Sequence, residues 1–478
     1  MTMKRLAIAV LLGWLLSGPQ ALAGPSRTNT IDGIWFGTLK SGPSAFRFAL
    51  HLQTKSGKLT GALDSLDHKA LGTPLTAVDC KDGKLTFKLE SWGVSYDAKL
   101  DALGTALDGE YQQNGRTYPL KFHKVDKLPD LARSQQPKRP YPYQEIHVTY
   151  RNQKADISLA GTLTVPRGDG PFPAVVLLSG TGPLDRDSTH AYHKPFLVLA
   201  DHLTRQGIAV LRVDGRGVGE TIGGNVWQST IPDFAEDARL GVSFLKGRKE
   251  INPAKIGLIG HSQGALVAPL AASQTKDVAF VVLLGVPALG GEELLHHVLQ
   301  KYWRDIGVDP AANPEFREIL ERIHKVLRAE KDQTKARAAL QALFKDELAK
   351  RPGFAKLSEK EQNEWFAKIE PDVRFHSSPW YRYVLGYDPR PVLAKVQCPV
   401  LALTGELDLQ VPPRDHLPQI RKALQAGGNK DFTVQELSHL NHMFQTARDA
   451  LPRDDAFIEE TFAPSALQLV SEWILKRK

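Results

Sequence analysis

Apolar and polar residues alternate along short segments of the N-terminal part of the chain, a period that is typical of half-buried β-strands. The clearest segments are residues 46–52, 85–89 and 96–100. Turn pairs separate such segments, namely Ser56-Gly57, Asp82-Gly83, Asp108-Gly109 and Asn114-Gly115. Closely spaced strands of this kind predict a small antiparallel barrel or sandwich over residues 28–125.

A proline-rich segment, residues 126–143, separates this region from the rest of the chain. It carries four prolines among polar residues, and this composition favours a semi-rigid linker. After it, the pattern changes to short continuous apolar runs that alternate with longer amphipathic segments. That order is typical of a mainly parallel sheet with helices on both faces.

The alternating elements fall in two stretches, residues 144–287 and 391–478. Strands are predicted at residues 157–165, 174–178, 208–213, 255–259, 278–284, 400–403 and 432–436, and helices at residues 196–205, 234–246, 263–272, 416–424 and 465–476. Residues 288–390 instead interleave Lys and Glu with a modest apolar stripe, which predicts helices such as 315–330 and 333–348. We interpret this excursion between two sheet strands as an inserted helical cap rather than a third independent domain. The predicted fold class is therefore α/β, with a cap and a small N-terminal β-rich domain.

Residues 1–23 have the organisation of a cleavable export signal. Lys4 and Arg5 supply positive charge, residues 6–16 are apolar, and Ala21-Leu22-Ala23 is a small-x-small cleavage site. A transmembrane anchor is the alternative, but a spanning helix needs about 20 apolar residues. This run is shorter, and Gly18-Pro19 interrupts it. We therefore expect a periplasmic or extracellular protein without stable membrane insertion.

The composition places the 478-residue chain among globular proteins, with 42% hydrophobic and 24% charged residues. It excludes disordered, collagen-like and coiled-coil chains. The net charge is +8, but acids and bases alternate, so no basic patch of the kind that binds nucleic acid is expected. The two cysteines, Cys80 and Cys398, lie in different predicted domains and cannot build a disulfide framework. Nothing in the pattern specifies an oligomeric state.

A G-x-S-x-G pattern occurs at Gly260-His261-Ser262-Gln263-Gly264, directly between a predicted strand and a predicted helix. A serine on so tight a turn needs flanking glycines, because side chains there would clash. The turn lifts the hydroxyl above the sheet and directs a helix N-terminus toward developing negative charge. Ser262 is therefore the candidate nucleophile, on an elbow formed by Gly260, His261 and Gly264.

A serine nucleophile needs a base and an acid that orients the base, and in this architecture they follow in the order Ser, acid, His. The loop after the strand at 400–403 contains Glu406 and Asp408, and we favour Asp408 because it lies deeper in the loop. After the next strand, His439 and His442 compete, and we favour His442, which lies farther from the strand. No third ligand of suitable spacing accompanies these histidines, so no metal is predicted.

The developing oxyanion needs two hydrogen-bond donors. One is the backbone N–H of Gln263, directly after the nucleophile. The second should come from the glycine-containing loop after the strand at 174–178, where we nominate the N–H of Thr181. In the same loop, residues 185–187 are predicted to form an ion-paired brace. A third glycine-rich segment, residues 214–219, departs from G-x-G-x-x-G and is interpreted as a structural turn.

From about residue 143 to 478 the chain resembles α/β-hydrolases of the bacterial carboxylesterase group related to serine aminopeptidases and dienelactone hydrolases. The residues that carry the resemblance are those of the loop at 178–187, Arg212-Val213-Asp214 with residues 216–219, the elbow at 260–264, Gly405-Glu406-Leu407-Asp408 and Asn441-His442. The resemblance implies an eight-stranded sheet, a Ser262–His442–Asp408 triad and ester hydrolysis without a cofactor. Some members carry a β-rich N-terminal domain. One departure is that many relatives begin the oxyanion loop with His-Gly, whereas this chain has Ser179-Gly180.

The sequence thus predicts a secreted serine hydrolase that cleaves a small-molecule carboxylic ester through an acyl-enzyme. An aminopeptidase or amidase on the same fold is an alternative, and it would need a carboxylate in the cap to bind the substrate ammonium. A third alternative is a non-catalytic protein that binds a glycan or wall polymer. In that case Trp35, Trp92 and Tyr96 would form a stacking platform on the N-terminal domain, although such aromatic residues more often belong to a core.

Overall fold

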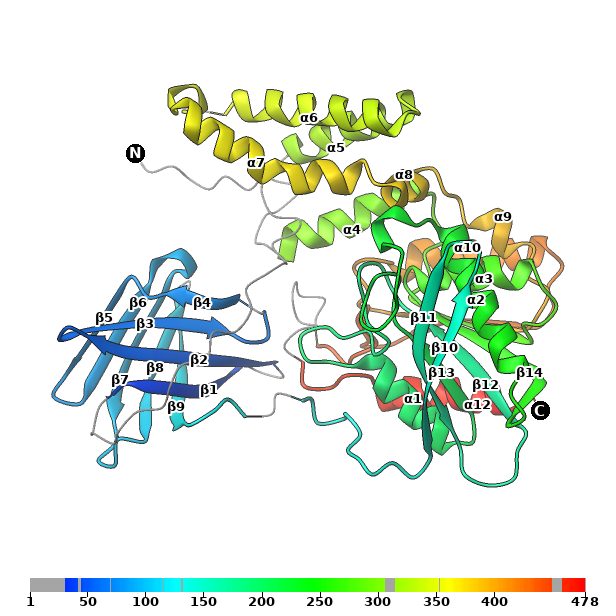
Figure 1. Cartoon of the computed structure of the whole chain (residues 1–478), viewed down its shortest axis with the longest axis horizontal. Helices are drawn as coiled ribbons and strands as arrows, with labels where there is room; N and C mark the ends of the chain where they lie inside the picture. The colour runs from blue at the N-terminus through cyan, green and yellow to red at the C-terminus, as the bar shows by residue number, and fades with distance from the viewer. Residues whose placement is uncertain are drawn as a thin grey trace.

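The structure is a computed structural model of the 478-residue chain. It describes residues 31–41, 44–68, 70–113, 115–129, 132–305, 314–351, 353–448 and 458–477. The predicted export signal, residues 1–23, and Asn114 of one predicted turn lie outside the described residues. The described chain forms two sheets and a group of helices that lies above them (Figure 1).

Nine described strands form the N-terminal sheet, which is antiparallel and has the order β4-β3-β2-β1-β9-β8-β7-β6-β5. They are β1 (Gly33–Ser41), β2 (Ser44–Lys55), β3 (Lys58–Ser65), β4 (Ala70–Pro74), β5 (Ala77–Lys81), β6 (Lys84–Leu89), β7 (Val94–Leu100), β8 (Ala106–Gln113) and β9 (Arg116–Val125). The sheet curls, so that β5 also contacts β3. The predicted turn at Asp108-Gly109 is wrong, because both residues lie inside β8. A Cβ on Gly109 would lie 2.3 Å from the carbonyl oxygen of Asp97, so this glycine permits the close approach of β7.

The curled sheet encloses its own hydrophobic core. Trp35 and Tyr96 are buried in it, with exposed fractions of 0% and 2%. The Tyr96 hydroxyl donates a hydrogen bond to the carbonyl of Leu120 (2.8 Å), which satisfies its polar end. Trp92 is half-buried. Since two of the three aromatic side chains lie inside the core, they do not form the stacking platform that a glycan-binding role would require.

The proline-rich segment contacts both parts of the molecule, through Asp67 on one side and Asp201 on the other. Arg133 and Tyr143 are buried, and the Tyr143 hydroxyl donates to Asp201 (2.9 Å). The Gln135 side chain accepts the backbone N–H of Phe462 (2.9 Å) and donates to its carbonyl (2.8 Å). Its contacts, as well as its prolines, therefore fix the path of this segment.

Eight described strands form the second sheet, in the order β10-β11-β13-β12-β14-β15-β16-β17. They are β10 (Gln144–Asn152), β11 (Ile157–Val165), β12 (Phe172–Leu178), β13 (Ala209–Val213), β14 (Ile251–His261), β15 (Phe280–Leu284), β16 (Val400–Gly405) and β17 (Phe432–Leu437). The five pairs from β13 to β17 are parallel, and the two pairs made by β11 are antiparallel. The mostly parallel eight-stranded sheet is thus confirmed, with β10 as a strand that the apolar pattern does not predict.

Helices cover both faces of this sheet (Figure 1). One face packs on α1 (Pro195–Arg205) and α12 (Pro464–Leu475). The other packs on α2 (Ile231–Lys246), α3 (Gly264–Ser273) and α10 (Pro413–Ala426). Neighbouring strand residues such as Val175 and Val176 belong to opposite cores, which explains why these strands read as continuous apolar runs.

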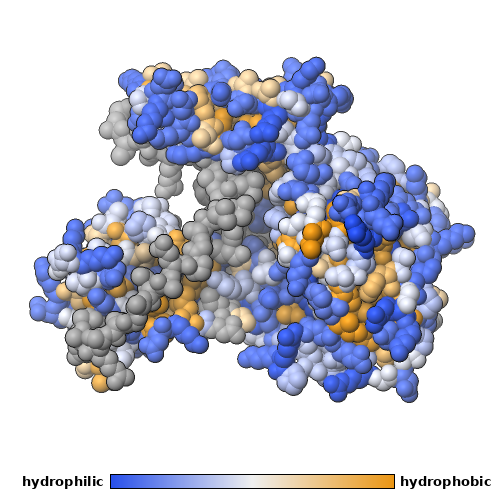
Figure 2. Space-filling model, viewed as in Figure 1, coloured by the Kyte–Doolittle hydropathy of each residue, from blue (hydrophilic) through white to orange (hydrophobic). Residues whose placement is uncertain are grey.

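A helical insertion lies between β15 and β16, as the sequence pattern predicts. Its elements are α4 (Gly291–Asp305), α5 (Pro314–Ala329), α6 (Gln333–Ala349), α7 (Glu359–His376), α8 (Pro379–Leu385) and α9 (Arg390–Leu393). In the visible face of Figure 2, hydrophilic residues dominate the ends of this insertion and hydrophobic residues gather between its helices. Among the residues that the structure describes, no helix combines the length and apolarity that a bilayer crossing requires.

Candidate active site

The predicted catalytic residues lie in loops that leave one edge of the second sheet. Ser262 follows β14, Asp408 follows β16 and His442 lies beyond β17. Because β14 to β17 are parallel neighbours, the loops after their carboxyl ends meet at the same edge. This register brings residues that are up to 180 positions apart in the chain to one place.

Steric limits on the backbone fix the turn that carries Ser262. Ser262 has a φ of 53°, in the left-handed region that non-glycine residues rarely adopt. A Cβ on Gly260 would lie 2.1 Å from the carbonyl oxygen of Gly264, and a Cβ on Gly264 would lie 2.0 Å from that of Leu178. The backbone N–H of Ser262 donates to the carbonyl of Leu284 on β15 (2.9 Å). The two glycines therefore allow the chain to turn sharply between β14 and α3.

His442 and Asp408 form a buried pair beside this turn. The Nδ1–H of His442 donates to Oδ2 of Asp408 (2.7 Å). The other carboxylate oxygen accepts the backbone N–H groups of Gln410 (2.9 Å) and Val411 (2.8 Å), which hold Asp408 in place. Since Nδ1 carries the proton, Nε2 of a neutral His442 is the nitrogen that is able to accept one.

The absence of a side chain at Gly285 leaves room for His442 and Asp408. The φ of Gly285 is +58°, and a Cβ there would lie 3.2 Å from Cε1 of His442 and 3.4 Å from Oδ2 of Asp408. Gly285 is not among the site residues predicted from the sequence. Its signal was a glycine directly after the apolar run of β15, at the same sheet edge as the elbow.

The competing residues occupy other positions. The backbone N–H of His439 donates to the Glu406 carboxylate (2.8 Å), and the His439 side chain is exposed. Neither residue lines the cavity that contains Ser262 and His442. The geometry therefore favours Asp408 and His442 over Glu406 and His439.

Ser262 and His442 line the same cavity, but among the described contacts the Ser262 hydroxyl has no hydrogen bond to the imidazole. Catalytic hydrogen bonds are often long in a ligand-free enzyme and tighten when substrate binds. The structure thus brings the two groups together at one cavity without joining them.

His261, between the glycine and the serine of the elbow, packs against His442, with the two ring centroids 4.9 Å apart. Its Nε2–H donates to the carbonyl of His442 (2.9 Å), because a carbonyl can only accept. Burial, and then the proximity of His442, lowers the pKa of His261 to about 4. His261 is therefore neutral at neutral pH and fixes the backbone of His442.

Two backbone donors face the region next to Ser262. Within the described chain, the N–H groups of Gln263 and Thr181 have no protein acceptor, and both residues line the cavity. The Gln263 side chain accepts the indole N–H of Trp380 (2.5 Å) and the Thr181 hydroxyl (3.4 Å). Trp380 belongs to α8 in the insertion, and no sequence signal marked it.

Ion pairs hold the loop after β12, and most of their partners lie outside the loop. Arg186 pairs with Asp214 (2.6 Å) and with Glu220, and Asp187 pairs with Arg212 and Lys194. Among the described residues Asp185 has no ion-pair partner, in contrast to the predicted brace. It instead accepts the backbone N–H groups of Asp187 (3.1 Å) and Thr189 (2.9 Å), which turns the loop. Asp214 also accepts the N–H of Glu220 (3.0 Å), in keeping with a structural turn at 214–219.

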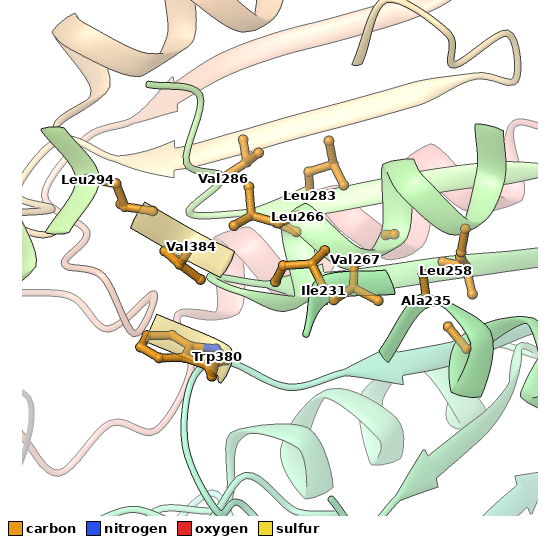
Figure 3. Packing of buried hydrophobic residues seen from close by; sticks show 14 of the residues in the cluster. Ile231, Ala235, Leu258, Leu266, Val267, Leu283, Val286, Leu294, Trp380 and Val384 are labelled. Carbon is orange, nitrogen blue, oxygen red and sulfur yellow. The ribbon is translucent and has the colours of Figure 1, made fainter. Parts of the chain in front are cut away.

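The cavity at Ser262 has a volume of about 310 Å³ and is mainly apolar. Its apolar wall combines side chains of α3, α4 and α8, of which Leu266, Leu294, Trp380 and Val384 are seen in Figure 3. None of the described residues that line it carries a carboxylate. The site therefore combines the Ser262 hydroxyl, the His442 imidazole and the backbone N–H groups of Gln263 and Thr181 in a mainly hydrophobic cavity.

Comparisons with known proteins agree with this fold. The sequence model of the serine aminopeptidase S33 family matches residues 187–356. Esterase EstD of Thermotoga maritima is 28% identical over 360 residues, which cover 75% of this chain and 72% of EstD.

Two solved structures are also similar to the chain. A hypothetical protein from Pseudomonas aeruginosa is 15% identical, with a TM-score of 0.44 and coverage of 74% of this chain and 99% of that one. An esterase from Pyrococcus furiosus is 17% identical, with a TM-score of 0.40 and coverage of 70% and 91%. The family match over residues 187–356, the similarity to EstD and the observed sheet together indicate a hydrolase with an α/β-hydrolase fold that is similar to the S33 serine aminopeptidases.

Proposed function

We propose that this chain is a serine carboxylesterase-type hydrolase that cleaves carboxylic esters through an acyl-enzyme. Ser262 is the nucleophile, His442 the general base and Asp408 the residue that orients the base. The observation that carries the proposal is the buried hydrogen bond of 2.7 Å between His442 Nδ1 and Asp408, beside the strained turn of Ser262.

In the first half of the reaction, Nε2 of His442 takes the proton of the Ser262 hydroxyl as the oxygen attacks the ester carbonyl. Asp408 holds the imidazole in the tautomer that leaves Nε2 free and stabilises the imidazolium that forms. Collapse of the tetrahedral intermediate breaks the bond to the alcohol oxygen. His442 returns its proton to that oxygen, and the acyl group stays on Ser262.

The negative charge of the intermediate falls on the former carbonyl oxygen. The N–H groups of Gln263 and Thr181 are the donors proposed for it, since neither has an acceptor in the described chain. In the second half, His442 takes a proton from water, the water oxygen attacks the acyl carbonyl and the acid leaves as Ser262 regains its proton.

The lining of the cavity favours an ester over an aminoacyl substrate. An aminopeptidase has to bind a substrate ammonium, and burying that cation without a partner is costly. No described residue of the cavity wall supplies a carboxylate, whereas leucine, valine and aromatic side chains do supply contacts for an apolar acyl or alcohol group. The alternative activity is therefore the less favoured one.

The direct experiment compares hydrolysis of p-nitrophenyl butyrate by the wild type and by Ser262→Ala. Loss of the nucleophile should lower kcat by about 10³-fold or more. Ser273→Ala is a matched control, because this serine lies at the end of the helix that follows Ser262 and its hydroxyl donates to the carbonyl of Leu270 in the same helix. If Ser262→Ala kept the wild-type rate, the assignment would be wrong.

A second assay separates the ester and peptide activities. The enzyme is given a p-nitrophenyl ester and an aminoacyl p-nitroanilide that carry the same acyl group. We expect a higher kcat/KM for the ester, and a preference for the charged anilide would favour the aminopeptidase.

We also propose that residues 1–23 direct export and are removed after Ala23. The composition of this segment supports the proposal. The intact mass of protein recovered from the periplasm or medium should correspond to a chain that begins at Gly24, and a retained leader would contradict it.

A further inference from the structure

The loop between β12 and α1, residues 179–194, contains three strained positions. Ser188, Ala191 and Tyr192 have φ values of 55°, 44° and 65°. Non-glycine residues persist in this left-handed region only where their surroundings over-determine the conformation. Specific contacts must therefore hold these residues in place.

Two of these residues, Ala191 and Tyr192, are consecutive and are called the strained pair below. Two side chains of the proline-rich segment donate hydrogen bonds to their carbonyls. Nη2 of Arg133 donates to the carbonyl of Ala191 (2.9 Å), and the Gln136 amide donates to that of Tyr192. Both bonds are at least partly buried, and Arg133 itself is 1% exposed. Side chains more than fifty residues away in the chain thus fix the backbone at this point.

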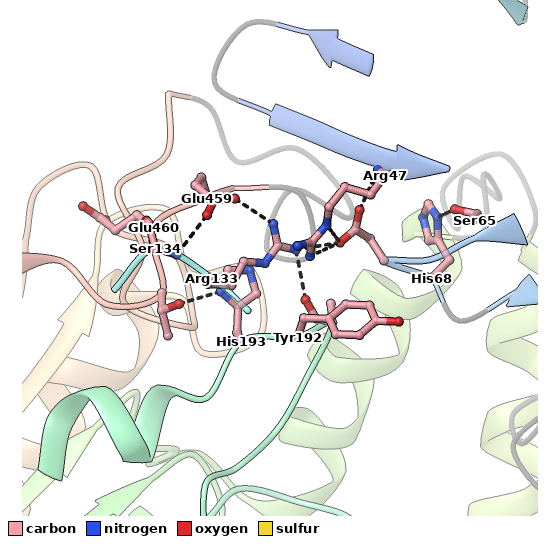
Figure 4. A network of polar contacts seen from close by, with 12 residues as sticks. Arg47, Ser65, His68, Arg133, Ser134, Tyr192, His193, Glu459 and Glu460 are labelled. Atoms are coloured by element: carbon pink, nitrogen blue, oxygen red, sulfur yellow. Dashed lines mark hydrogen bonds and ion pairs between the residues drawn. The ribbon is translucent and has the colours of Figure 1, made fainter. Parts of the chain in front are cut away.

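The N-terminal sheet completes this arrangement from the other side. The guanidinium of Arg47 lies over the Tyr192 ring, 5.0 Å from its centroid, and Phe46 packs on Ala191. Asp67 joins the parts, because it accepts from Nε of Arg47 (2.9 Å) and from Nη2 of Arg133 (2.8 Å). Figure 4 shows this network, with Arg133 between Arg47 and Glu459.

The strained pair lies next to the catalytic cavity. Ser188 and His190, from the same loop, line the cavity together with Ser262 and His442. His190 and His193 exchange backbone hydrogen bonds across the strained pair (3.0 and 2.7 Å). A change in the path of Ala191 and Tyr192 therefore moves residues of the cavity wall.

We propose that the N-terminal sheet and the proline-rich segment form a clamp that holds loop 185–194 in the shape the cavity requires. The clamp consists of Phe46, Arg47, Asp67, Arg133 and Gln136. Arg133 and Gln136 are then positioning residues for substrate binding, and they touch neither the substrate nor the reacting atoms. The kinetic part of this proposal rests on the proposed function, whereas the structural part does not.

The test variants are Arg133→Met and Gln136→Ala, alone and combined. Arg133→Met leaves neither of the described carboxylate partners of Arg133 buried and unpaired, because Asp67 keeps Arg47 and Glu459 is half-exposed. Gln135→Ala is the matched control. It lies on the same segment and binds the same part of the molecule, but its partners are Thr461 and Phe462 rather than the strained pair. Thermal unfolding of each variant establishes that the chain remains folded.

The first measurement is amide hydrogen exchange of peptides that cover residues 185–194. In the double variant we expect exchange at least about tenfold faster there, with the peptide of the elbow unchanged. Gln135→Ala should leave loop exchange at the wild-type rate. This result does not depend on which substrate the enzyme uses, so it stays informative if the ester assay fails.

The second measurement is the split between KM and kcat for p-nitrophenyl esters of short and long acyl chains. Because the clamp shapes the wall and not the elbow, KM should rise and the acyl-chain preference should shift, while kcat changes by less than about threefold. Wild-type exchange in loop 185–194 of the double variant would overturn the proposal. Equal effects of Gln135→Ala on the loop would do so too.

Discussion

Two segments at the same sheet edge border the catalytic cavity, and their conformations have different origins. The elbow at 260–264 is fixed by close packing of backbone against backbone, because there is no space for a Cβ at Gly260 or Gly264. The loop at 179–194 is fixed by side chains from elsewhere, among them Arg133 and Gln136. Ser262, the proposed nucleophile, is thus placed by local geometry, and the cavity wall is placed by remote contacts.

This difference predicts different responses to mutation. Substitutions at the elbow, or in the loop that contains Asp408, should abolish activity. That loop, like the elbow, is held by local contacts, because the N–H groups of Gln410 and Val411 donate to the Asp408 carboxylate. Substitutions of the distant residues that hold the cavity wall should instead weaken substrate binding and leave the rate of the chemical step nearly unchanged. An enzyme in which both segments responded alike would contradict the comparison.

The largest effect is expected for Asp408→Asn. The amide cannot hold His442 in the required tautomer, so kcat should fall by about 10³–10⁴-fold with the fold unchanged. The measurement is steady-state hydrolysis of p-nitrophenyl butyrate. Glu406→Gln is the control, because Glu406 bonds to the backbone of His439 outside the cavity, and it should behave as the wild type.

Gly264→Ala should have the next largest effect. The new Cβ would lie 2.0 Å from the carbonyl of Leu178, so the turn has to shift. A displacement of the nucleophile by about 1 Å costs about 10²-fold in rate. The control is Gly247→Ala, because the φ of Gly247 is −78° and a Cβ there would lie 3.5 Å from the carbonyl oxygen of Phe244, an ordinary van der Waals contact. Wild-type activity in Gly264→Ala would show that sterics do not place Ser262.

His261→Phe should have a smaller effect on the same turn. It removes the hydrogen bond to the His442 carbonyl and leaves that acceptor unsatisfied, at a cost of about 1–3 kcal/mol. If this loss displaces the base, kcat should fall by roughly tenfold while KM stays within about twofold. A rise in KM with unchanged kcat would instead indicate that His261 shapes the cavity wall and does not position His442.

The smallest effect is a pH dependence of stability. Burial lowers the pKa of His261, His376 and His416 to about 4. Below about pH 6.5 the unfolded chain takes up protons at these residues and the folded chain does not, so stability falls as the pH drops toward 4. Thermal unfolding at pH 7 and pH 5 should show a loss of several degrees, and His261→Phe should have a flatter dependence. An unchanged slope in that variant would contradict the burial of His261.

The same contrast explains what the sequence could predict. The elbow, Asp408 and His442 can be predicted as site residues because local chemistry marks them: glycines around a serine, and polar residues directly after apolar strands. The strands of the second sheet were predictable for the same reason, since burial on both faces makes them continuously apolar.

Residues that act through distant contacts carry no such mark. Trp380 reaches Gln263 from the insertion, and Arg133 reaches Ala191 from the proline-rich segment. In a sequence, each reads as an ordinary surface or core residue. Gly109 was misjudged as a turn residue because the close approach of β7 depends on strand pairing, which the local pattern does not contain.

Covalent labelling directly tests the identity of the nucleophile, on which the proposed mechanism depends most. The folded enzyme is treated with a fluorophosphonate, digested with trypsin and mapped by mass spectrometry. We expect the label on Ser262, within the peptide of residues 256–276, and none in Ser262→Ala. Ester hydrolysis without labelling, or a label on another serine, would contradict the account.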